Sequence, residues 1–284
     1  MMRRKLILVL IVISALGLIV HCGGGSSTPS FPSLAGTWTG SAWVGDLPVG
    51  PRAASLEAVP QVILPPCPTI DGFADIELVM TSDGTPTDLL ICAQSVNDLL
   101  DTSVSAVVDQ VDASENVLWV TFSAAATGSD LYAGGLVLDD SANYATVFFW
   151  DAITEEDIIF GVLQRTTEVL PFSEAAMVGS WSGITVDFEE IGDDIFYEKF
   201  SPLDMTLSDA NSLAISGTDP DGFPFAGISS MADTVYGYFE GSIAAELDLS
   251  LEGFVSPDGE FFGGSVEEFD GSGLEWSIIN MRKQ

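Results

Sequence analysis

The sequence predicts an all-β protein made of two tandem antiparallel β-domains. Apolar and polar residues alternate with a period of two in stretches such as 203–207 and 247–252, the pattern of strands with one buried face. Turn-forming clusters, for example 139–141 and 257–259, recur about every eight to twelve residues, as in antiparallel hairpins. A series of short motifs also occurs twice in the same order. Each domain is therefore expected to be a β-barrel or a barrel-like sheet or sandwich.

The repeated motifs indicate a tandem duplication. A Gly-x-Trp-x-Gly segment at 36–40 recurs at 179–183, and each copy closes on an apolar strand that ends in arginine, at Arg165 and Arg282. Looser matches join 78–83 to 203–209 and 135–140 to 253–258. About eight or nine strands are expected in each copy, enough to close a small barrel.

Composition divides the chain into segments with different expected roles. The predicted order is a signal helix at 1–21, a flexible Gly/Ser tether at 22–33, a first β-domain at 34–165, a linker at 166–176 and a second β-domain at 177–284. The first copy is the longer because it carries a proline-rich stretch between Pro48 and Pro68, which predicts an inserted loop.

The N-terminus has the features of an export signal. Three basic residues at 3–5 precede an apolar run at 6–20, which is shorter than the roughly 20 residues that span a bilayer. Cys22 and the glycines after it resemble the lipobox of bacterial lipoproteins, although His21 stands where a small residue is usual. An uncleaved anchor or an ordinary cleaved signal remains the alternative.

The lipobox resemblance implies that Cys22 is acylated and becomes the new N-terminus. The protein would then be extracytoplasmic, with the membrane as a partner through its lipid anchor. Because Gly23 rather than aspartate follows the cysteine, the resemblance implies the outer membrane of a bacterial cell envelope.

The charge of the mature chain excludes one class of partner. Removal of residues 1–21 leaves five basic and 42 acidic residues, a formal charge of −37. Nucleic acid is excluded, since binding to phosphates needs clustered lysine and arginine. The acids are scattered, which favours a solvated surface over a cation site.

Two cysteines and the absence of histidine limit the chemistry. Cys67 and Cys92 are predicted to form a disulfide, worth about 3 kcal/mol for a loop of about 25 residues, with a metal site as the alternative. The single histidine, His21, lies in the signal, which excludes histidine-based catalysis and histidine-bound zinc. We predict no enzymatic activity and no cofactor. Asp219 and Asp221 resemble part of a calcium loop, but a hairpin turn is favoured because the other ligands are missing.

A Gly-x-Trp on the first strand and an arginine on the last strand resemble the lipocalin and wider calycin pattern. In that family the tryptophan closes one end of the barrel and the arginine packs across its ring. The resemblance implies two pairs here, Trp38 with Arg165 and Trp181 with Arg282, each worth about 0.5–2 kcal/mol.

These observations leave two functions open. The first is binding of a small apolar or amphipathic ligand inside a barrel. The alternative is a structural or protein-interaction module of the envelope, with filled barrels and another envelope protein as partner. Adjacent aromatics at 148–150 and 261–262 fit either a ligand cavity or a core, and some are expected to be exposed because neighbouring residues point to opposite faces of a strand.

Overall fold

The computed structural model describes a subset of the chain. The described residues are 32–45, 72–97, 100, 105–112, 117–127, 130–151, 157–166, 178–191, 194–208, 213–218, 224–233, 235–244, 248–269 and 274–284. The predicted signal helix lies outside these residues. The domain boundaries proposed above remain predictions, whereas the all-β prediction is confirmed, since all seventeen elements of the described residues are strands.

The first nine strands form one antiparallel sheet, here named the first β-unit. Its spatial order is β4-β3-β2-β1-β9-β8-β7-β6-β5. Because β4 and β5 end the order without a ladder between them, this sheet is open. The strands are β1 Gly36–Val44, β2 Gly72–Met80, β3 Pro86–Ile91, β4 Gln94–Ser95, β5 Val107–Asp112, β6 Val117–Thr127, β7 Asp130–Leu138, β8 Tyr144–Asp151 and β9 Asp157–Gln164.

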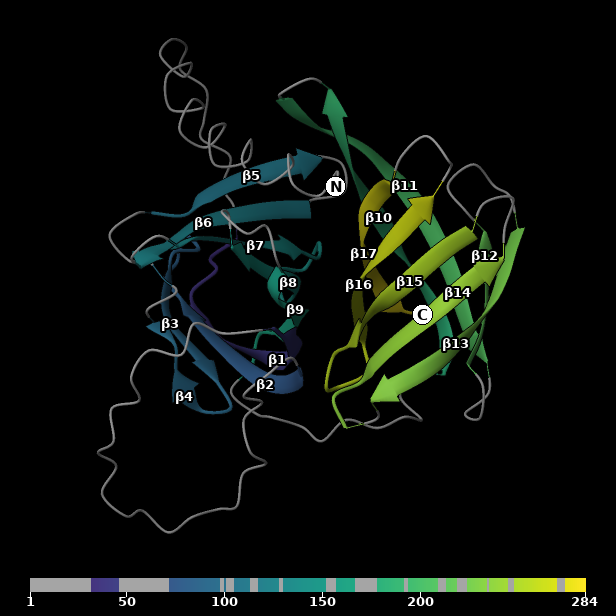
Figure 1. The fold of residues 1–284 in the computed structure, drawn as a ribbon, viewed down its shortest axis with the longest axis horizontal. Coiled ribbons are helices and arrows are strands. Elements are labelled where there is room, and N and C mark those ends of the chain that lie inside the picture. The colour runs from purple at the N-terminus through teal and green to yellow at the C-terminus, as the bar shows by residue number, and fades with distance from the viewer. Residues whose placement is uncertain are drawn as a thin grey trace.

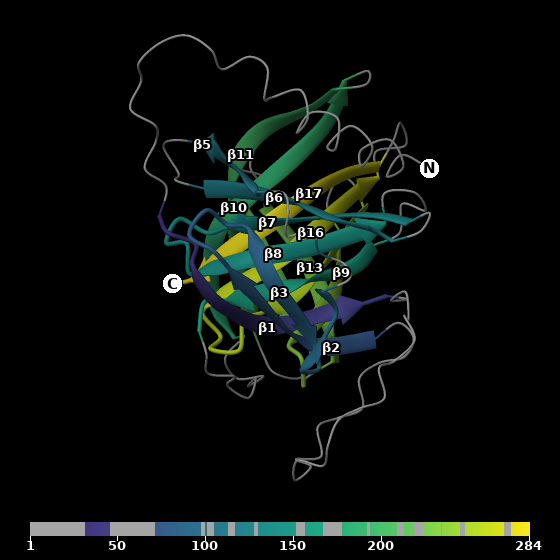
Figure 2. The same cartoon turned by 90° about the vertical axis from the view of Figure 1, so that its left-hand side faces the viewer.

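The remaining eight strands form the second β-unit, a closed barrel. Each strand pairs with its neighbours in sequence, and β10 also pairs with β17, which closes the barrel. The strands are β10 Gly179–Ile191, β11 Asp194–Ser208, β12 Leu213–Thr218, β13 Pro224–Asp233, β14 Tyr238–Ala244, β15 Asp248–Val255, β16 Phe261–Phe269 and β17 Leu274–Lys283. Figure 1 shows the two units side by side, and in Figure 2 the first unit lies in front of the barrel.

The repeated Gly-x-Trp-x-Gly motif has a geometric reason in both units. A Cβ on Gly40 would lie 1.8 Å from the carbonyl oxygen of Val162, and one on Gly183 would lie 2.0 Å from that of Asn280. The second glycine of the motif therefore lets the first strand approach the last strand closely. The tryptophans between the glycines are buried, with 0% exposure at Trp38 and 1% at Trp181.

The described side chains of the first β-unit pack around one apolar core. Residues from β1, β2, β3, β6, β7, β8 and β9 pack in one apolar cluster, and the β2–β3 turn reaches the other end of the sheet, where Ala106 N donates to Thr85 Oγ1 at 3.0 Å. A side chain without accessible surface cannot be touched by a water molecule, so no water-sized cavity lies against it. Those with 0% exposure in this cluster are Trp38, Ala42, Ala74, Leu78, Leu118, Val120, Leu136, Leu138, Ala145, Ile159 and Leu163.

The outer faces of the two units pack against each other, and we name this interface the joint. Strands β15 and β16 contact β9, β16 and β17 contact β8, and β17 also contacts β7. Phe148 is 7% exposed, Phe149 1%, and both Phe261 and Phe262 0%. These four rings are buried, because the joint covers the face of each strand that a single sheet would leave in water, whereas the side chain of Trp150 lies outside the described residues.

Candidate functional site

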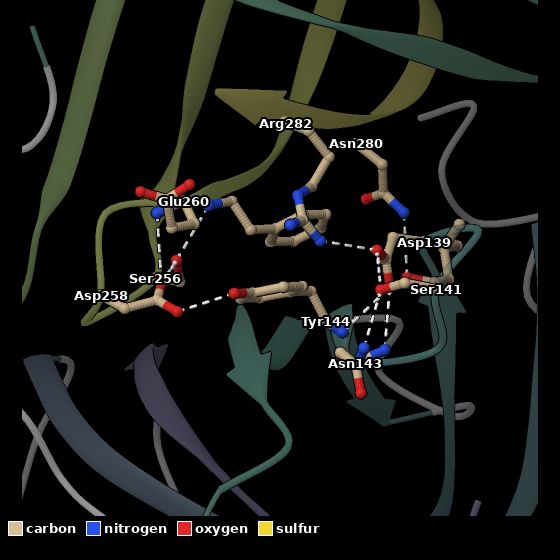
Figure 3. Close-up of polar contacts among 11 residues, drawn as sticks. Asp139, Ser141, Asn143, Tyr144, Ser256, Asp258, Glu260, Asn280 and Arg282 are labelled. Atoms are coloured by element: carbon tan, nitrogen blue, oxygen red, sulfur yellow. Dashed lines mark hydrogen bonds and ion pairs between the residues drawn. The ribbon is translucent and has the colours of Figure 1, made fainter. Parts of the chain in front are cut away.

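One side of the joint, the polar flank, consists of Asp139, Tyr144, Asp258, Asn280 and Arg282 (Figure 3). It begins at the tight turn between β7 and β8. The Asp139 carboxylate accepts hydrogen bonds from the backbone N–H groups of Asn143 and Tyr144, both at 3.0 Å, and from Ser141 Oγ at 2.6 Å. These bonds fix a turn in which Ala142 has a φ of 52°, a conformation that costs a residue with a Cβ some strain.

Arg282 of β17 links the barrel to this turn. Its Nη1 lies 2.9 Å from Asp139 Oδ2, and its guanidinium carbon lies 4.3 Å from the centre of the Tyr144 ring. The Asp139 side chain is 4% exposed and that of Arg282 is 39% exposed. A buried carboxylate is thus bound by a cation that also stacks on an aromatic ring, a geometry that suits arginine.

Tyr144 extends the polar flank to the β15–β16 turn. Its hydroxyl donates to Asp258 Oδ2 at 2.7 Å, and its ring stacks on Phe261 with 5.3 Å between centroids. Burial raises the pKa of Tyr144 far above its ordinary value, and the Asp258 carboxylate raises this pKa further. The tyrosine therefore stays a neutral donor at physiological pH.

A buried amide sets the position of β17 on the first β-unit. Thr146 Oγ1 donates to Asn280 Oδ1 at 2.6 Å, and Asn280 Nδ2 donates to the carbonyl oxygen of Val137 at 3.0 Å. Both side chains are buried, with 4% exposure at Asn280 and 0% at Thr146. Gly263 makes this approach possible, because a Cβ there would lie 2.2 Å from Thr146 Oγ1.

The other side of the joint, the aromatic flank, consists of Trp43, Phe73 and Phe160 from the first β-unit and Tyr236, Tyr238 and Phe254 from the barrel. The ring centroids of Phe73 and Tyr238 are 4.7 Å apart, and those of Phe160 and Phe254 are 6.4 Å apart. Tilted and edge-on rings at such separations attract each other beyond the area they bury. The two flanks thus join the same units by different interactions.

Carboxylates accompany the aromatic flank as well. The Tyr238 hydroxyl donates to Glu252 Oε2 at 3.2 Å, and Glu240 lies directly opposite Glu252 in the β14–β15 ladder. Burial raises the pKa of Tyr238 well above its ordinary value, and the charges of Glu252 and Glu240 raise it further.

The structure brings together the first predicted tryptophan–arginine pair. The Arg165 guanidinium carbon lies 5.8 Å from the centre of the Trp38 ring. Arg165 Nη1 donates to the carbonyl oxygen of Ser33 at 2.9 Å, and Nη2 donates to that of Ala35. The ring is held in turn, since Trp38 Nε1 donates to the carbonyl oxygen of Leu34 at 3.2 Å.

The second predicted pair needs a correction, because Lys283 rather than Arg282 lies over Trp181. The Lys283 Nζ is 5.7 Å from the ring centre, and Trp181 is paired with Lys283 in the β10–β17 ladder. Residues opposite each other in a ladder point to the same face, and the next residue points to the other. Arg282 therefore projects from the outside of the barrel into the joint.

The turns of the two units show why matching arginine to arginine was misleading. Asp139 N bonds to Tyr144 O in one turn, and Ser256 N bonds to Phe261 O in the other. In the first turn, the carbonyl oxygen of Asn143, the residue before Tyr144, accepts from the N–H of Arg165. In the second turn, the carbonyl oxygen of Glu260, the residue before Phe261, accepts from the N–H of Lys283. By these hydrogen bonds, the counterpart of Arg165 is Lys283.

The cysteine and calcium predictions fall largely outside the described residues. Cys22, Cys67, Asp219 and Asp221 lie in parts of the chain that the structure does not describe. Cys92 is disulfide-bonded, and its sulfur partner is not among the described residues. It occupies the β3–β4 turn with a φ of 49°, followed by Ala93 at 57°, the left-handed pair of a tight hairpin.

Sequence reasoning missed the joint. Asp139, Tyr144, Asp258 and Asn280 lie in segments that the sequence assigned to ordinary turns and strands. The one available signal was the run of adjacent aromatics, since two neighbouring buried rings require cover on both faces of a strand. Among the described residues, no group of three or more side chains is suited to hold a metal ion, and no helix is long and apolar enough to cross a bilayer.

Comparison with known proteins adds little. No protein-family model matches the chain, and no curated protein sequence matches it significantly. Matches among solved structures include a double mutant of transferrin-binding protein B from Haemophilus parasuis, at 12% identity and a TM-score of 0.35, covering 74% of this chain and 51% of that chain. This chain thus spans about half the length of that protein.

Two further solved structures match over most of their length. A protein of unknown function from the DUF3598 family of Nostoc punctiforme has 9% identity and a TM-score of 0.32, with 88% of this chain and 96% of that chain covered. A candidate outer membrane protein from Bacteroides fragilis has 10% identity and a TM-score of 0.28, with coverages of 88% and 98%. Likeness at this level supports no functional argument, so function is argued from the chain's own residues.

Proposed function

We propose that the mature chain is a lipid-anchored, non-catalytic interaction module of the bacterial cell envelope. In this proposal the two β-units act as one body and bind other envelope molecules through their outer surface. The observation that carries the proposal is the apolar core of the first β-unit, whose described cluster members are at most 6% exposed. A ligand would therefore bind outside the described part of this core.

The joint supports the same proposal. Its core side chains are as buried as those of the first unit, with 0% exposure at Val162, Ile278, Phe254 and Phe261. An ion pair with the buried Asp139 carboxylate and a buried amide network restrict the relative position of the units, because a buried carboxylate or amide left unpaired is costly. A module that presents a fixed surface needs such a connection.

Binding of a small apolar ligand in the barrel is the second candidate. The closed order of β10 to β17 favours it, since eight-stranded barrels can hold one small ligand. Against it, Trp181, Phe239, Phe262, Ile279 and Met281, which line the described part of the interior, are at most 1% exposed.

A carboxylate-based hydrolase receives little support. Glu240 and Glu252 face each other on neighbouring strands, but Glu240 is exposed to solvent. Glycoside hydrolysis requires two carboxyl groups that flank a bound sugar, which an open strand surface does not hold in place.

Native mass spectrometry of the chain from Gly23 onward, secreted by a bacterial host, separates the two candidates. The interaction module predicts the bare mass of the polypeptide. A reproducible extra mass that is lost on denaturation would contradict the module and support the ligand-binding barrel.

Anchoring is tested separately in cells. Replacement of the acylated residue, Cys22→Ser, is expected to move the protein from the membrane fraction to the soluble fraction, because the lipid chains supply the membrane affinity. Cys92→Ser serves as the matched control and should leave the distribution unchanged. Unchanged membrane retention of the Cys22 variant would refute the lipid anchor.

A further inference from the structure

The strand contacts of the joint are the same when viewed from either unit. The last three strands of the first β-unit, β7, β8 and β9, face the last three strands of the barrel, β15, β16 and β17. Exchanging the units turns the β15–β9 contact into β7–β17 and the β16–β9 contact into β8–β17, while β16–β8 turns into itself. This is the pattern of an isologous interface, in which both partners use the same patch.

The strand ladders match the two faces residue by residue. Tyr144 is the first residue of β8 and is paired with Gln164 of β9. Phe261 is the first residue of β16 and is paired with Arg282 of β17. The positions matched in this way, with the first β-unit named before the barrel, are Asp139 and Ser256, Tyr144 and Phe261, Thr146 and Gly263, Val162 and Asn280, and Gln164 and Arg282.

On the axis of this symmetry, matched residues meet each other. The ring of Tyr144 stacks on that of Phe261, with 5.3 Å between centroids. A Cβ on Gly263 would lie 2.2 Å from the hydroxyl oxygen of Thr146, so these two positions also face each other directly. A residue that contacts its own counterpart marks the axis of an isologous pair.

Away from the axis, contacts come in reciprocal pairs. Thr146 Oγ1 donates to Asn280 Oδ1 at 2.6 Å, a contact from β8 to β17. The exchanged contact, from β16 to β9, joins Gly263 to Val162, because a Cβ on Gly263 would lie 2.7 Å from Val162 Cγ2. The chain therefore contains two versions of one patch, and the joint is the pairing of these versions.

The residues that differ between the two versions decide which faces can pair. Two first-unit faces would place Thr146 against Thr146, where the structure has room only for a glycine. Two barrel faces would place the Asn280 amide against a glycine and Arg282 against Ser256 instead of Asp139. A buried amide left unpaired is costly. Pairing of unlike faces is therefore favoured over pairing of like faces.

We propose that the joint face is a self-recognition surface, and that its external partner is the unlike unit of a second copy of this chain. In such a pair the first β-unit of one copy binds the barrel of the other through the contacts of the joint. Within one chain, the short connection between β9 and β10 gives the units an effective concentration of roughly millimolar, so the internal joint prevails in dilute solution. This pairing goes beyond the proposed function, because a module that stays monomeric can still bind other envelope molecules.

Complementation between two variants of the chain from Gly23 onward tests the proposal. Gly263→Val blocks the barrel face and leaves the first-unit face intact. Thr146→Arg blocks the first-unit face and leaves the barrel face intact. Neither variant alone contains both intact faces, so neither can form the joint within a chain or between copies. An equimolar mixture restores one joint between two chains.

Native mass spectrometry of an isotope-labelled Gly263→Val chain and an unlabelled Thr146→Arg chain gives the readout. At about 100 µM, below the effective concentration within one chain, the proposal predicts a complex with one chain of each kind in the mixture and monomers in each variant alone. The control chain carries both substitutions and should form no complex with either variant. Monomers in the mixture, with the circular dichroism of the unaltered chain kept in both variants, would overturn the proposal. Dimers that are as abundant with the control chain would also overturn it.

Refolding of the unaltered chain tests the same pairing without any substitution, should either variant fail to fold. Labelled and unlabelled copies are refolded together from urea at about 1 mM and at about 0.1 mM, since pairing between copies competes with the effective concentration within one chain. The proposal predicts mixed dimers at the higher concentration and about a tenfold smaller ratio of dimer to monomer at the lower one. Monomers at both concentrations would overturn it.

Discussion

The two flanks of the joint connect the same pair of β-units through different chemistry. On the polar flank, Arg282, Asp139 and Tyr144 satisfy one another, and Asn280 bonds to the backbone of the facing unit. On the aromatic flank, rings such as those of Phe73 and Tyr238 pack against each other across the joint, and the Tyr238 hydroxyl donates to Glu252 within its own unit.

This difference suggests a division of roles within one interface. Directional bonds between buried groups tolerate little displacement, because a small shift leaves a buried donor or acceptor unpaired. Ring packing tolerates more, because aromatic pairs attract each other over a range of tilts and separations. We infer that the polar flank fixes the relative position of the units, whereas the aromatic flank adds contact area that tolerates small displacements.

The largest expected effect comes from removing the buried carboxylate of the polar flank. Asp139→Ala leaves the Arg282 guanidinium and two backbone N–H groups without their acceptor, and should lower the free energy of unfolding by about 3 kcal/mol. Urea denaturation measures this change. The exposed neighbour provides the control, since Asp140→Ala should change stability by less than about 0.5 kcal/mol. Similar values for the two variants would show that the polar flank does not fix the joint.

A smaller effect is expected from filling the gap that lets the units approach. In Gly263→Val the new side chain would collide with Thr146 and with Val162, because a Cβ at residue 263 would lie 2.7 Å from Val162 Cγ2. Overpacking of this kind costs about 2 kcal/mol. Urea denaturation gives the loss, and small-angle scattering should show a longer particle as the units separate. Unchanged stability and dimensions would contradict the close contact at Gly263.

The variant Arg282→Lys tests how much the stacking of the guanidinium on Tyr144 contributes to stability. Lysine keeps the charge but loses the planar stack on Tyr144, so a loss of about 1 kcal/mol is expected. A double-mutant cycle with Tyr144→Leu measures the part that depends on the ring, and the coupling energy should account for most of that loss. A coupling energy near zero would leave only the ion pair with Asp139.

The smallest predicted effect is a pH dependence of the free energy of unfolding, which is confined to the alkaline range. The folded-state pKa values of Tyr144 and Tyr238 lie above the unfolded value of about 10. The folded state therefore holds these protons more tightly, and their contribution to stability is complete below about pH 10 and lost as the pH rises toward the folded-state pKa values.

Urea denaturation between about pH 8 and pH 11 tests this dependence. Stability should fall as the pH rises above about 10, and the fall should be shallower in the double variant Tyr144→Phe, Tyr238→Phe. Tyrosinate absorbance of the folded protein gives a second measure, because these two tyrosines should ionise late. An equally steep fall in the double variant would contradict the assignment.

The strands could be predicted from the sequence because each follows a local rule. Period-two alternation and turn residues define the hairpins, and the Gly-x-Trp-x-Gly segments mark a close crossing of strands that depends on Gly40 and Gly183. Local rules do not identify what covers the second face of a strand. Thr146 and Asn280 look like ordinary polar strand residues until a second unit buries them.

The error at Arg282 has the same origin. Arginine and lysine stand next to each other at the end of β17, and a shift of one residue exchanges the inside of the barrel for the joint. Composition favoured Arg282 as the counterpart of Arg165, whereas the hydrogen bonds of Lys283 and Glu260 decide for Lys283. Pairing between units depends on such long-range register, which one sequence does not contain.

Differential scanning calorimetry of the chain from Gly23 onward tests the central claim, that the joint makes the two β-units one body. The account predicts a single transition whose calorimetric and van't Hoff enthalpies agree, and its division into two transitions in Asp139→Ala. Two independent transitions in the unaltered protein, unmoved by that substitution, would contradict it.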